Sequence, residues 1–241
     1  MGIHLPRAKK RNSVMVTIYR LSRVLSFLPP RQRLRLWLDL EWTFERLAHE
    51  HSFLVFPPRN HPVRLGTMAF LAEHLEHTDR VLDVGCKRGE LAQLMAPRVA
   101  EVLGIDLDND ALTFARAENE LASVRFLLGD AIKYCQDHTG LFDVVVLCHV
   151  IEHLDDPQRL LRAAARCRRG VFIEVPDLER SLSNQYRVLA ESDLVYSDPD
   201  HVWEFDRQQL RGLVTACGMQ TEHEEVRGGV IRLWCVPASA T

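Results

Sequence analysis

From residue 80 onward, short apolar runs alternate with amphipathic stretches along the chain. The apolar runs are rich in β-branched residues, and the stretches between them carry the apolar spacing of helices. This alternation predicts βαβ units and a parallel sheet. The runs that predict parallel strands are RVLDV (80–84), EVLGIDL (101–107), VRFLL (124–128), FDVVVL (142–147) and GVFIEVP (170–176).

Helices are predicted between these strands and after them. Their amphipathic segments are ELAQLMAP (90–97), DALTFARAENEL (110–121), a stretch near 157–168 and FDRQQLRGLVTACGM (205–219). Residues 177–205 have no clear period, and we expect irregular structure there.

Two extended runs close the chain, QTEHEEV (220–226) and VIRLWCV (230–236). They are joined by Arg227-Gly228-Gly229, and a Gly-Gly pair between extended runs is a hairpin signal. The whole pattern predicts an α/β fold with a doubly wound, mostly parallel seven-stranded sheet and a terminal antiparallel hairpin.

Residues 1–62 are predicted to form a helical extension or lid, and residues 63–241 the main domain. The strongest helical segment of the extension is LRLWLDLEWTFERLAHE (34–50). Residues 14–28 predict an amphipathic helix that is too short and too charged to span a bilayer. Prolines at 57, 58 and 62 break the chain before a further helix at 63–75.

The charge of the chain is unevenly distributed. Residues 1–38 contain nine Lys or Arg and no acidic residue, which leaves 21 basic against 33 acidic residues in the remainder. Such a basic arm could make weak contact with an anionic membrane surface, an acidic substrate or nucleic acid. The simpler expectation is a solvated, partly helical extension, in which the helix at 14–28 packs on its own domain rather than on lipid. The acidic body disfavours nucleic acid as a partner.

Size and cysteine content indicate the general class of protein. A chain of 241 residues usually forms one domain with at most a small appendage. Its six cysteines are scattered without a Cys-x-x-Cys pair, which predicts reduced thiols and a cytoplasmic location. The sequence does not indicate an oligomeric state.

Glycines and acidic residues follow the predicted strands in a regular order. Asp83 lies at the end of the first strand, Gly85 opens the following turn and Gly89 lies where the next helix begins. Asp106 ends the second strand, 21 residues after Gly85, and Asp130 follows the third. A glycine turn lets a ligand approach the backbone, and a carboxylate at the second strand can accept ribose hydroxyl protons. The pattern predicts a nucleotide site.

The segments VLDVGCKRGE, GIDLD, LLGDA and FDVVVLCHVIEHLDDP resemble the successive motifs of class I methyltransferases that use S-adenosylmethionine (SAM). The resemblance runs from about residue 64 to the end and implies a Rossmann-like fold with SAM as cofactor. By position it implies that the methionine end of SAM lies at Asp83 and the Gly85 turn, the ribose at Asp106, and the adenine at Leu107, Asp130 and Ala131.

One residue departs from the family pattern. The family usually has a glycine between Gly85 and Gly89, where this sequence has Lys87. If that position needs a positive φ, the lysine is strained by about 1–3 kcal/mol. A nicotinamide dehydrogenase is the natural rival, but its fingerprint requires G-x-G-x-x-G, and this turn has only G-x-x-x-G.

The segment after the fourth strand carries the candidate chemistry, because the resemblance places the methyl group there. An acceptor hydroxyl needs a base to take its proton. His149 is the first residue past the predicted strand and is our candidate base, with His153 as the second candidate. An architectural role for the segment is the alternative, because Glu152-His153 followed by Asp156-Pro157 is common in the family.

The same histidines suggest a metal. In a helical turn His149, Glu152 and His153 share one face, and His201 follows 48 residues after His153. This layout is similar to small-RNA 3′-terminal 2′-O-methyltransferases, which hold Mg²⁺ with carboxylates and histidines, although they have a glutamate where this chain has His149. We therefore predict a divalent ion, Mg²⁺ or Mn²⁺, at these four residues; three histidines suit Mn²⁺, Zn²⁺ or Fe²⁺ better than Mg²⁺.

The leading hypothesis for function is O-methylation of a sugar, a glycan or a similar polyhydroxylated small molecule. Tyr186, Tyr196 and Trp203 lie in the region expected to be irregular, where aromatic faces could pack against a sugar ring. A metal-dependent RNA 2′-O-methyltransferase is the first alternative, favoured by the basic arm. A non-catalytic partner protein with the SAM fold is the second.

Overall fold

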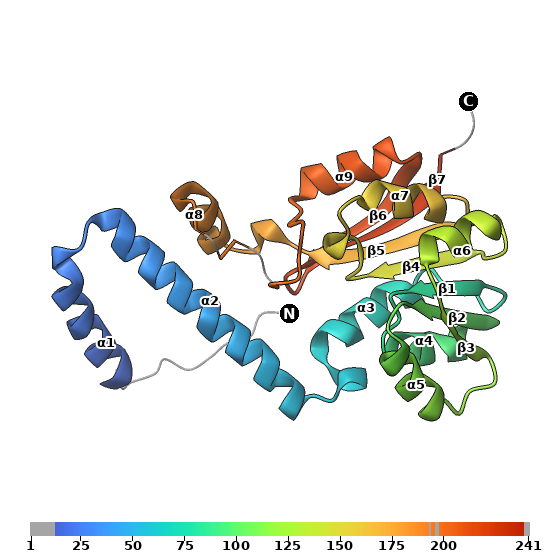
Figure 1. Cartoon of the computed structure of the whole chain (residues 1–241), viewed down its shortest axis with the longest axis horizontal. Coiled ribbons are helices and arrows are strands. Elements are labelled where there is room, and N and C mark those ends of the chain that lie inside the picture. Colours follow the sequence, from blue (N-terminus) through green and yellow to red (C-terminus); the bar gives the residue numbers. More distant parts are fainter. Residues whose placement is uncertain (1–12, 193, 196–197, 239–241) are drawn as a thin grey trace.

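The computed structural model describes residues 13–192, 194–195 and 198–238. Its centre is a seven-stranded sheet with the order β3-β2-β1-β4-β5-β7-β6 (Figure 1). Strand β7 pairs antiparallel with both of its neighbours, and the other pairs are parallel. This confirms the predicted fold. The strands are β1 (Arg80–Val84), β2 (Glu101–Asp106), β3 (Val124–Leu128), β4 (Val144–Cys148), β5 (Gly170–Pro176), β6 (Met219–Arg227) and β7 (Val230–Pro237).

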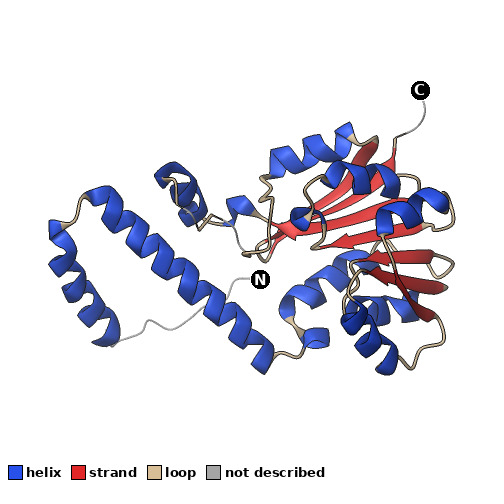
Figure 2. Ribbon diagram, viewed as in Figure 1, coloured by secondary structure: helices blue, strands red, loops and turns tan. Residues whose placement is uncertain are grey.

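Helices cover both faces of the sheet (Figure 2), which explains why the central strands are apolar throughout. Alternate residues of β1 belong to different cores: Leu82 and Val84 pack in one, and Val81 in the other. The first core also takes side chains from α6 (Ala131–Asp137), α7 (Pro157–Ala164) and α9 (Arg207–Ala216). The second takes side chains from α3 (Pro62–Ala72) and α4 (Glu90–Met95), and α5 (Asn109–Ala117) lies beside β3.

The terminal hairpin forms as predicted. Gly228 and Gly229 have φ values of 66° and 82°, the left-handed conformations that a two-residue hairpin turn requires. Helix α6 was not predicted. Residues 177–205, expected to be irregular, contain α8 (Leu182–Ala190). This helix buries Asn184 and Arg187, and a helix that buries polar side chains carries no apolar period for sequence analysis to detect.

The N-terminal extension consists of α1 (Ser13–Val24) and α2 (Pro30–Val55), which reach out from the sheet (Figures 1 and 2). Helix α2 packs on α8, where Arg187 donates to the Leu38 carbonyl at 3.1 Å and to Glu41 at 2.7 Å. Helix α1 buries none of its residues, so the expectation that it packs on its own domain is wrong. No helix in the described part of the chain has both the length and the apolarity that crossing a membrane requires.

Candidate active site

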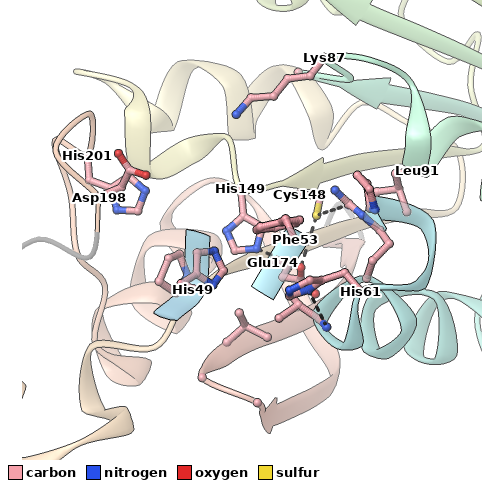
Figure 3. A pocket seen from close by; sticks show the side chains of 18 of the residues that line it. His49, Phe53, His61, Lys87, Leu91, Cys148, His149, Glu174, Asp198 and His201 are labelled. Carbon is pink, nitrogen blue, oxygen red and sulfur yellow. Dashed lines mark hydrogen bonds and ion pairs between the residues drawn. The ribbon is translucent and has the colours of Figure 1, made fainter. Parts of the chain in front are cut away.

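A cavity of about 470 Å³ opens at the carboxyl ends of β1, β4 and β5 (Figure 3). The strand order reverses between β1 and β4, and ligands of doubly wound sheets bind at this switch point. Helix α2 supplies the opposite wall of the cavity, as the sequence predicted for a helical lid.

The turn after β1 forms one end of the cavity and depends on its glycines. Gly85 has φ 66°, and a Cβ there would lie 2.9 Å from Cγ2 of Val150. At Gly89 a Cβ would lie 2.3 Å from the Phe126 ring. Lys87 has φ 46°, so it occupies the left-handed conformation that we expected to strain it. Its backbone N–H donates to Oδ2 of Asp106 at 2.7 Å, which ties the turn to β2.

Asp83 points to a ligand at this end of the cavity. It is only 2% exposed, and its Oδ2 has no hydrogen-bond partner among the residues that the structure describes. Burial raises the pKa of this carboxyl to about 7, although Arg64 opposes the shift. Buried carboxylate oxygens are nearly always hydrogen-bonded, so a cationic ligand group would supply the missing donor.

The other predicted nucleotide-binding residues lie at the ends of β2 and β3, outside the lining of the cavity. Asp106 accepts a second amide, from Asp108, at 2.9 Å. Asp130 caps α6, where its Oδ1 accepts from the amides of residues 132 and 133. Leu107 is 77% exposed, and Ala131 begins α6. Neighbouring strand ends thus bring Asp106 and Asp130 to one edge of the sheet.

A buried group of charges forms the floor of the cavity, and its centre is Glu174 of β5. The register places Cys148 of β4 and Arg232 of β7 directly beside it. Arg232 Nε donates to Glu174 at 2.5 Å, and Thr67 Oγ1 of α3 lies within 2.9 Å of both carboxylate oxygens. A Cβ on Gly66 would lie 2.9 Å from the Arg232 guanidinium, so this glycine makes room for the pair.

His149 joins this group through both ring nitrogens. Its Nε2 lies 3.1 Å from Glu174, and its Nδ1 lies 3.1 Å from Glu152. Burial lowers the pKa of His149, but its hydrogen bonds to the two glutamates outweigh burial and raise the pKa to about 9. Burial raises the pKa of Glu174, but the hydrogen bond and charge of His149, with the charge of Arg232, lower it to about 2. His149 is therefore an imidazolium at neutral pH, which argues against its predicted role as a base.

The four predicted metal ligands do not form a single group, although His149 and Glu152 are in contact. His149 has φ 54°, and a short 3₁₀ turn, Ile151–His153, replaces the expected helix. His149 is thereby directed toward Glu174. The structure instead groups Glu152, His153 and His201, whose ligand atoms lie within 4.8 Å of one another.

This group of Glu152, His153 and His201 has features of a metal site. Glu152 is fully buried, and its Oε2 lacks a hydrogen-bond partner in the described structure. Nδ1 of His153 lies 3.2 Å from the Asp200 carbonyl, and Nδ1 of His201 lies 2.8 Å from Glu204. Hydrogen bonds of this kind orient the histidine ligands of metals in proteins.

The aromatic residues near the cavity are not those that the sequence analysis selected. Tyr186 and Trp203 are outside its lining, and the Trp203 indole donates to the Leu154 carbonyl at 2.9 Å. Tyr196 lies outside the described residues. The aromatic wall instead comes from α2 and the start of α3: Trp42, His49, Phe53 and His61.

Two signals in the sequence could have identified the residues that were missed. Trp42, His49 and Phe53 repeat at seven and four residues, the spacing of one helix face. Glu174 and Arg232 are single charges within the apolar runs GVFIEVP and VIRLWCV, and charges inside buried strands are normally paired.

The sheet order, the glycine turn and the carboxylates at the strand ends define a Rossmann-like nucleotide-binding protein. Residues 41–224 match the family model described as a methyltransferase domain. This match covers most of the chain, and the protein belongs to the class I SAM-dependent methyltransferase family.

Curated relatives are similar over part of the chain. A ubiquinone biosynthesis O-methyltransferase of Pectobacterium carotovorum is 36% identical over 132 residues, which is 54% of this chain and 51% of the relative. The protein of the same name from Escherichia coli O7:K1 is 35% identical over 132 residues, 54% of this chain and 50% of the relative. The chain thus spans about half the length of the curated relatives it matches.

Solved structures share the fold. A SAM-dependent methyltransferase from Archaeoglobus fulgidus has a TM-score of 0.58 at 18% identity, over 79% of this chain and 98% of that one. The PH0226 protein of Pyrococcus horikoshii OT3 has a TM-score of 0.60 at 21% identity, over 77% and 97%. At these identities the likeness concerns the fold alone.

Proposed function

We propose that this protein is an O-methyltransferase that methylates a ring hydroxyl of an aromatic acceptor with SAM. The observation that carries this proposal is a single cavity with two different ends. The carboxylate of Asp83, whose Oδ2 lacks a described partner, lies at one end, and the aromatic and histidine wall of α2 lies at the other.

The nucleotide end fits SAM. The α-ammonium group of SAM would supply the donor that Asp83 Oδ2 lacks, and the guanidinium of Arg64 in the same cavity suits its carboxylate. Asp106 would accept from the ribose, and the adenine would lie near Leu107, Asp130 and Ala131. SAM supplies an electrophilic methyl group on a sulfonium. The contribution of the chain is to orient that methyl group in line with the acceptor oxygen.

The acceptor end favours a flat ring. Phe53 and His61 stack with ring centroids 4.3 Å apart, and His49 and Trp42 extend the same wall. The names of the relatives place O-methylation in ubiquinone biosynthesis, which agrees with an aromatic acceptor more than with a sugar. Tyr186 and Trp203, two of the aromatic residues expected to hold a sugar, do not line the cavity. The proposed acceptor therefore differs from the one that the sequence suggested.

We also propose that Glu152, His153 and His201 hold a divalent metal. The unpaired Oε2 of Glu152 is a carboxylate oxygen suited to such an ion, and two histidines with one carboxylate suit Mn²⁺, Zn²⁺ or Fe²⁺ better than Mg²⁺. A bound ion would lower the pKa of an acceptor hydroxyl. His153 is the remaining candidate base when no ion is bound, because it lines the cavity.

A polyhydroxylated acceptor is the second candidate. Arg46, Asp198 and Asp200 line the cavity beside the aromatic wall, and such groups can hydrogen-bond sugar hydroxyls. A cytoplasmic location remains a prediction from the cysteine pattern.

The test is a SAM-consumption assay with catechols, oligosaccharides and short RNAs, each with EDTA or with added Mn²⁺, Zn²⁺ or Mg²⁺. Turnover of catechols supports the proposal; turnover of oligosaccharides or RNA alone overturns the aromatic acceptor. Absence of SAM binding by calorimetry indicates the non-catalytic partner protein. Loss of turnover in EDTA supports the metal, and then His153→Ala should lower affinity for Mn²⁺ at least about tenfold. His138→Ala, an exposed histidine of α6, is the matched control.

A further inference from the structure

In the part of the chain that the structure describes, the N-terminal helices carry rows of exposed apolar side chains. On α2, Leu36, Leu40, Phe44 and Leu47 repeat at four, four and three residues, and all are between 37% and 65% exposed. On α1, Val14, Ile18 and Leu21 form a similar row and are between 47% and 62% exposed. We call these two rows together the outer face. Contiguous exposed apolar surface of this kind marks an interaction site in soluble proteins.

Helix α2 has two faces with different tasks. The residues that line the cavity, Trp42, Arg46, His49 and Phe53, repeat at four, three and four residues. At 3.6 residues per turn, this row lies roughly 150° around the helix from the row of Leu36 to Leu47. Helix α2 therefore lies between the cavity and any surface that binds the outer face. Its diameter, roughly 10 Å, sets the distance between them.

The charge beside the outer face is positive. In the described segment 13–38 there are five arginines and no acidic residue. Two of them, Arg31 and Arg35, bind to the end of α8. Arg20 and Arg23 are exposed on the side of α1 opposite its apolar row. An apolar row on a helix with an arginine-bearing polar side is the pattern of a helix that lies in the interface of an anionic membrane.

We propose that the outer face binds the surface of an anionic lipid bilayer, with the apolar rows of α1 and α2 in the interface. A second copy of this chain is the other possible occupant. Pairing two outer faces would bring the arginine-rich α1 helices of both copies together, and repulsion between like charges opposes that arrangement. Lipid headgroups instead supply the opposite charge.

The experiment is flotation of the whole protein with vesicles of phosphatidylcholine, with and without phosphatidylglycerol. We expect binding to the anionic vesicles only, and loss of that binding in high salt. Leu40→Glu with Phe44→Glu should reduce binding at least about tenfold, because two large apolar side chains are removed from the interface. Arg20→Gln and Arg23→Gln should each reduce it by about fivefold.

Controls separate docking from loss of fold and from self-association. Leu121→Glu changes an apolar side chain that is 38% exposed on the turn before β3, and it should leave flotation unchanged. SAM affinity by calorimetry should be equal in all variants, because none of these residues lines the cavity. The proposal is overturned if the wild type does not float with anionic vesicles. It is also overturned if light scattering shows a dimer that Phe44→Glu dissociates.

Discussion

The two ends of the cavity are built in different ways. The nucleotide end consists of backbone features: a glycine turn, strand ends and one carboxylate that accepts backbone amides. The acceptor end consists of side chains from distant segments: those of α3, β5, β7 and the segment after β4 meet in a set of charges, and α2 supplies the aromatic wall. Local backbone features leave a short sequence signature, whereas contacts between distant segments leave only isolated residues. This difference explains why the sequence predicted the nucleotide end of the cavity but not the acceptor end.

The strongest test of the acceptor end is Glu174→Gln. Removing this charge leaves the buried Arg232 and the half-buried His149 without their shared partner, so we expect the free energy of unfolding to fall by about 3–5 kcal/mol. Urea denaturation measures the loss. Glu225→Gln removes the exposed partner of Arg232 and should cost less than about 1 kcal/mol. If Glu174→Gln is too unstable to purify, Thr67→Val should still cost about 1 kcal/mol. Equal stability of the two glutamine variants would show that the charge of Glu174 is not coupled to those of Arg232 and His149.

The corresponding test of the nucleotide end is Asp106→Ala. The carboxylate should contribute charged hydrogen bonds to the ribose, so its loss should weaken SAM binding by about 100-fold. Calorimetric titration measures this change. Asp108→Ala removes the cap of α5 and should lower stability by about 1 kcal/mol with little effect on affinity. A similar loss of affinity in both variants would assign the effect to the loop as a whole.

The pH dependence of stability should separate the two ends further. Because the pKa of His149 is raised from 6.5 to about 9, its contribution is complete below pH 6.5 and is lost as the pH rises through 9. Glu174, whose pKa is lowered to about 2, stays ionised over that whole range. The difference in unfolding free energy between wild type and His149→Gln should therefore shrink from about pH 6 to about pH 9.5. His138→Gln is the control, and a difference independent of pH would contradict the ion pair.

The smallest expected effect concerns the strained turn. Lys87→Gly relieves a left-handed lysine but adds freedom to the unfolded chain, so we expect a net gain of about 0.5–1 kcal/mol in stability. Thermal unfolding measures it. Glu191→Gly, at the left-handed residue that ends α8, should give a gain of similar size. A loss of stability at Lys87 would mean that its side chain makes compensating contacts.

The strands and the hairpin could be predicted because their periodicity and turn residues are local. Asp83, Asp106 and Gly85 could be placed for the same reason. The positive φ of His149 could not be foreseen, nor could the contact of its ring with Glu174 as well as with Glu152. Helix α8 was missed because the side chains it buries are polar. The sequence identified the histidines as candidate site residues, but their carboxylate partners depend on contacts that only the folded structure defines.

The pairing of Glu174 with Arg232 links the site to the order in which the chain is synthesised. The two residues are 58 positions apart, and Arg232 belongs to the last strand. At about 5–20 residues per second, roughly 3–12 seconds pass between their syntheses. During that interval the carboxylate of Glu174 has no guanidinium partner. Burying it between strands β1 to β5 therefore costs free energy until β7 is added. The cavity floor therefore forms late. A nascent chain that stalls before β7 should be cleaved by proteases more readily than the complete chain.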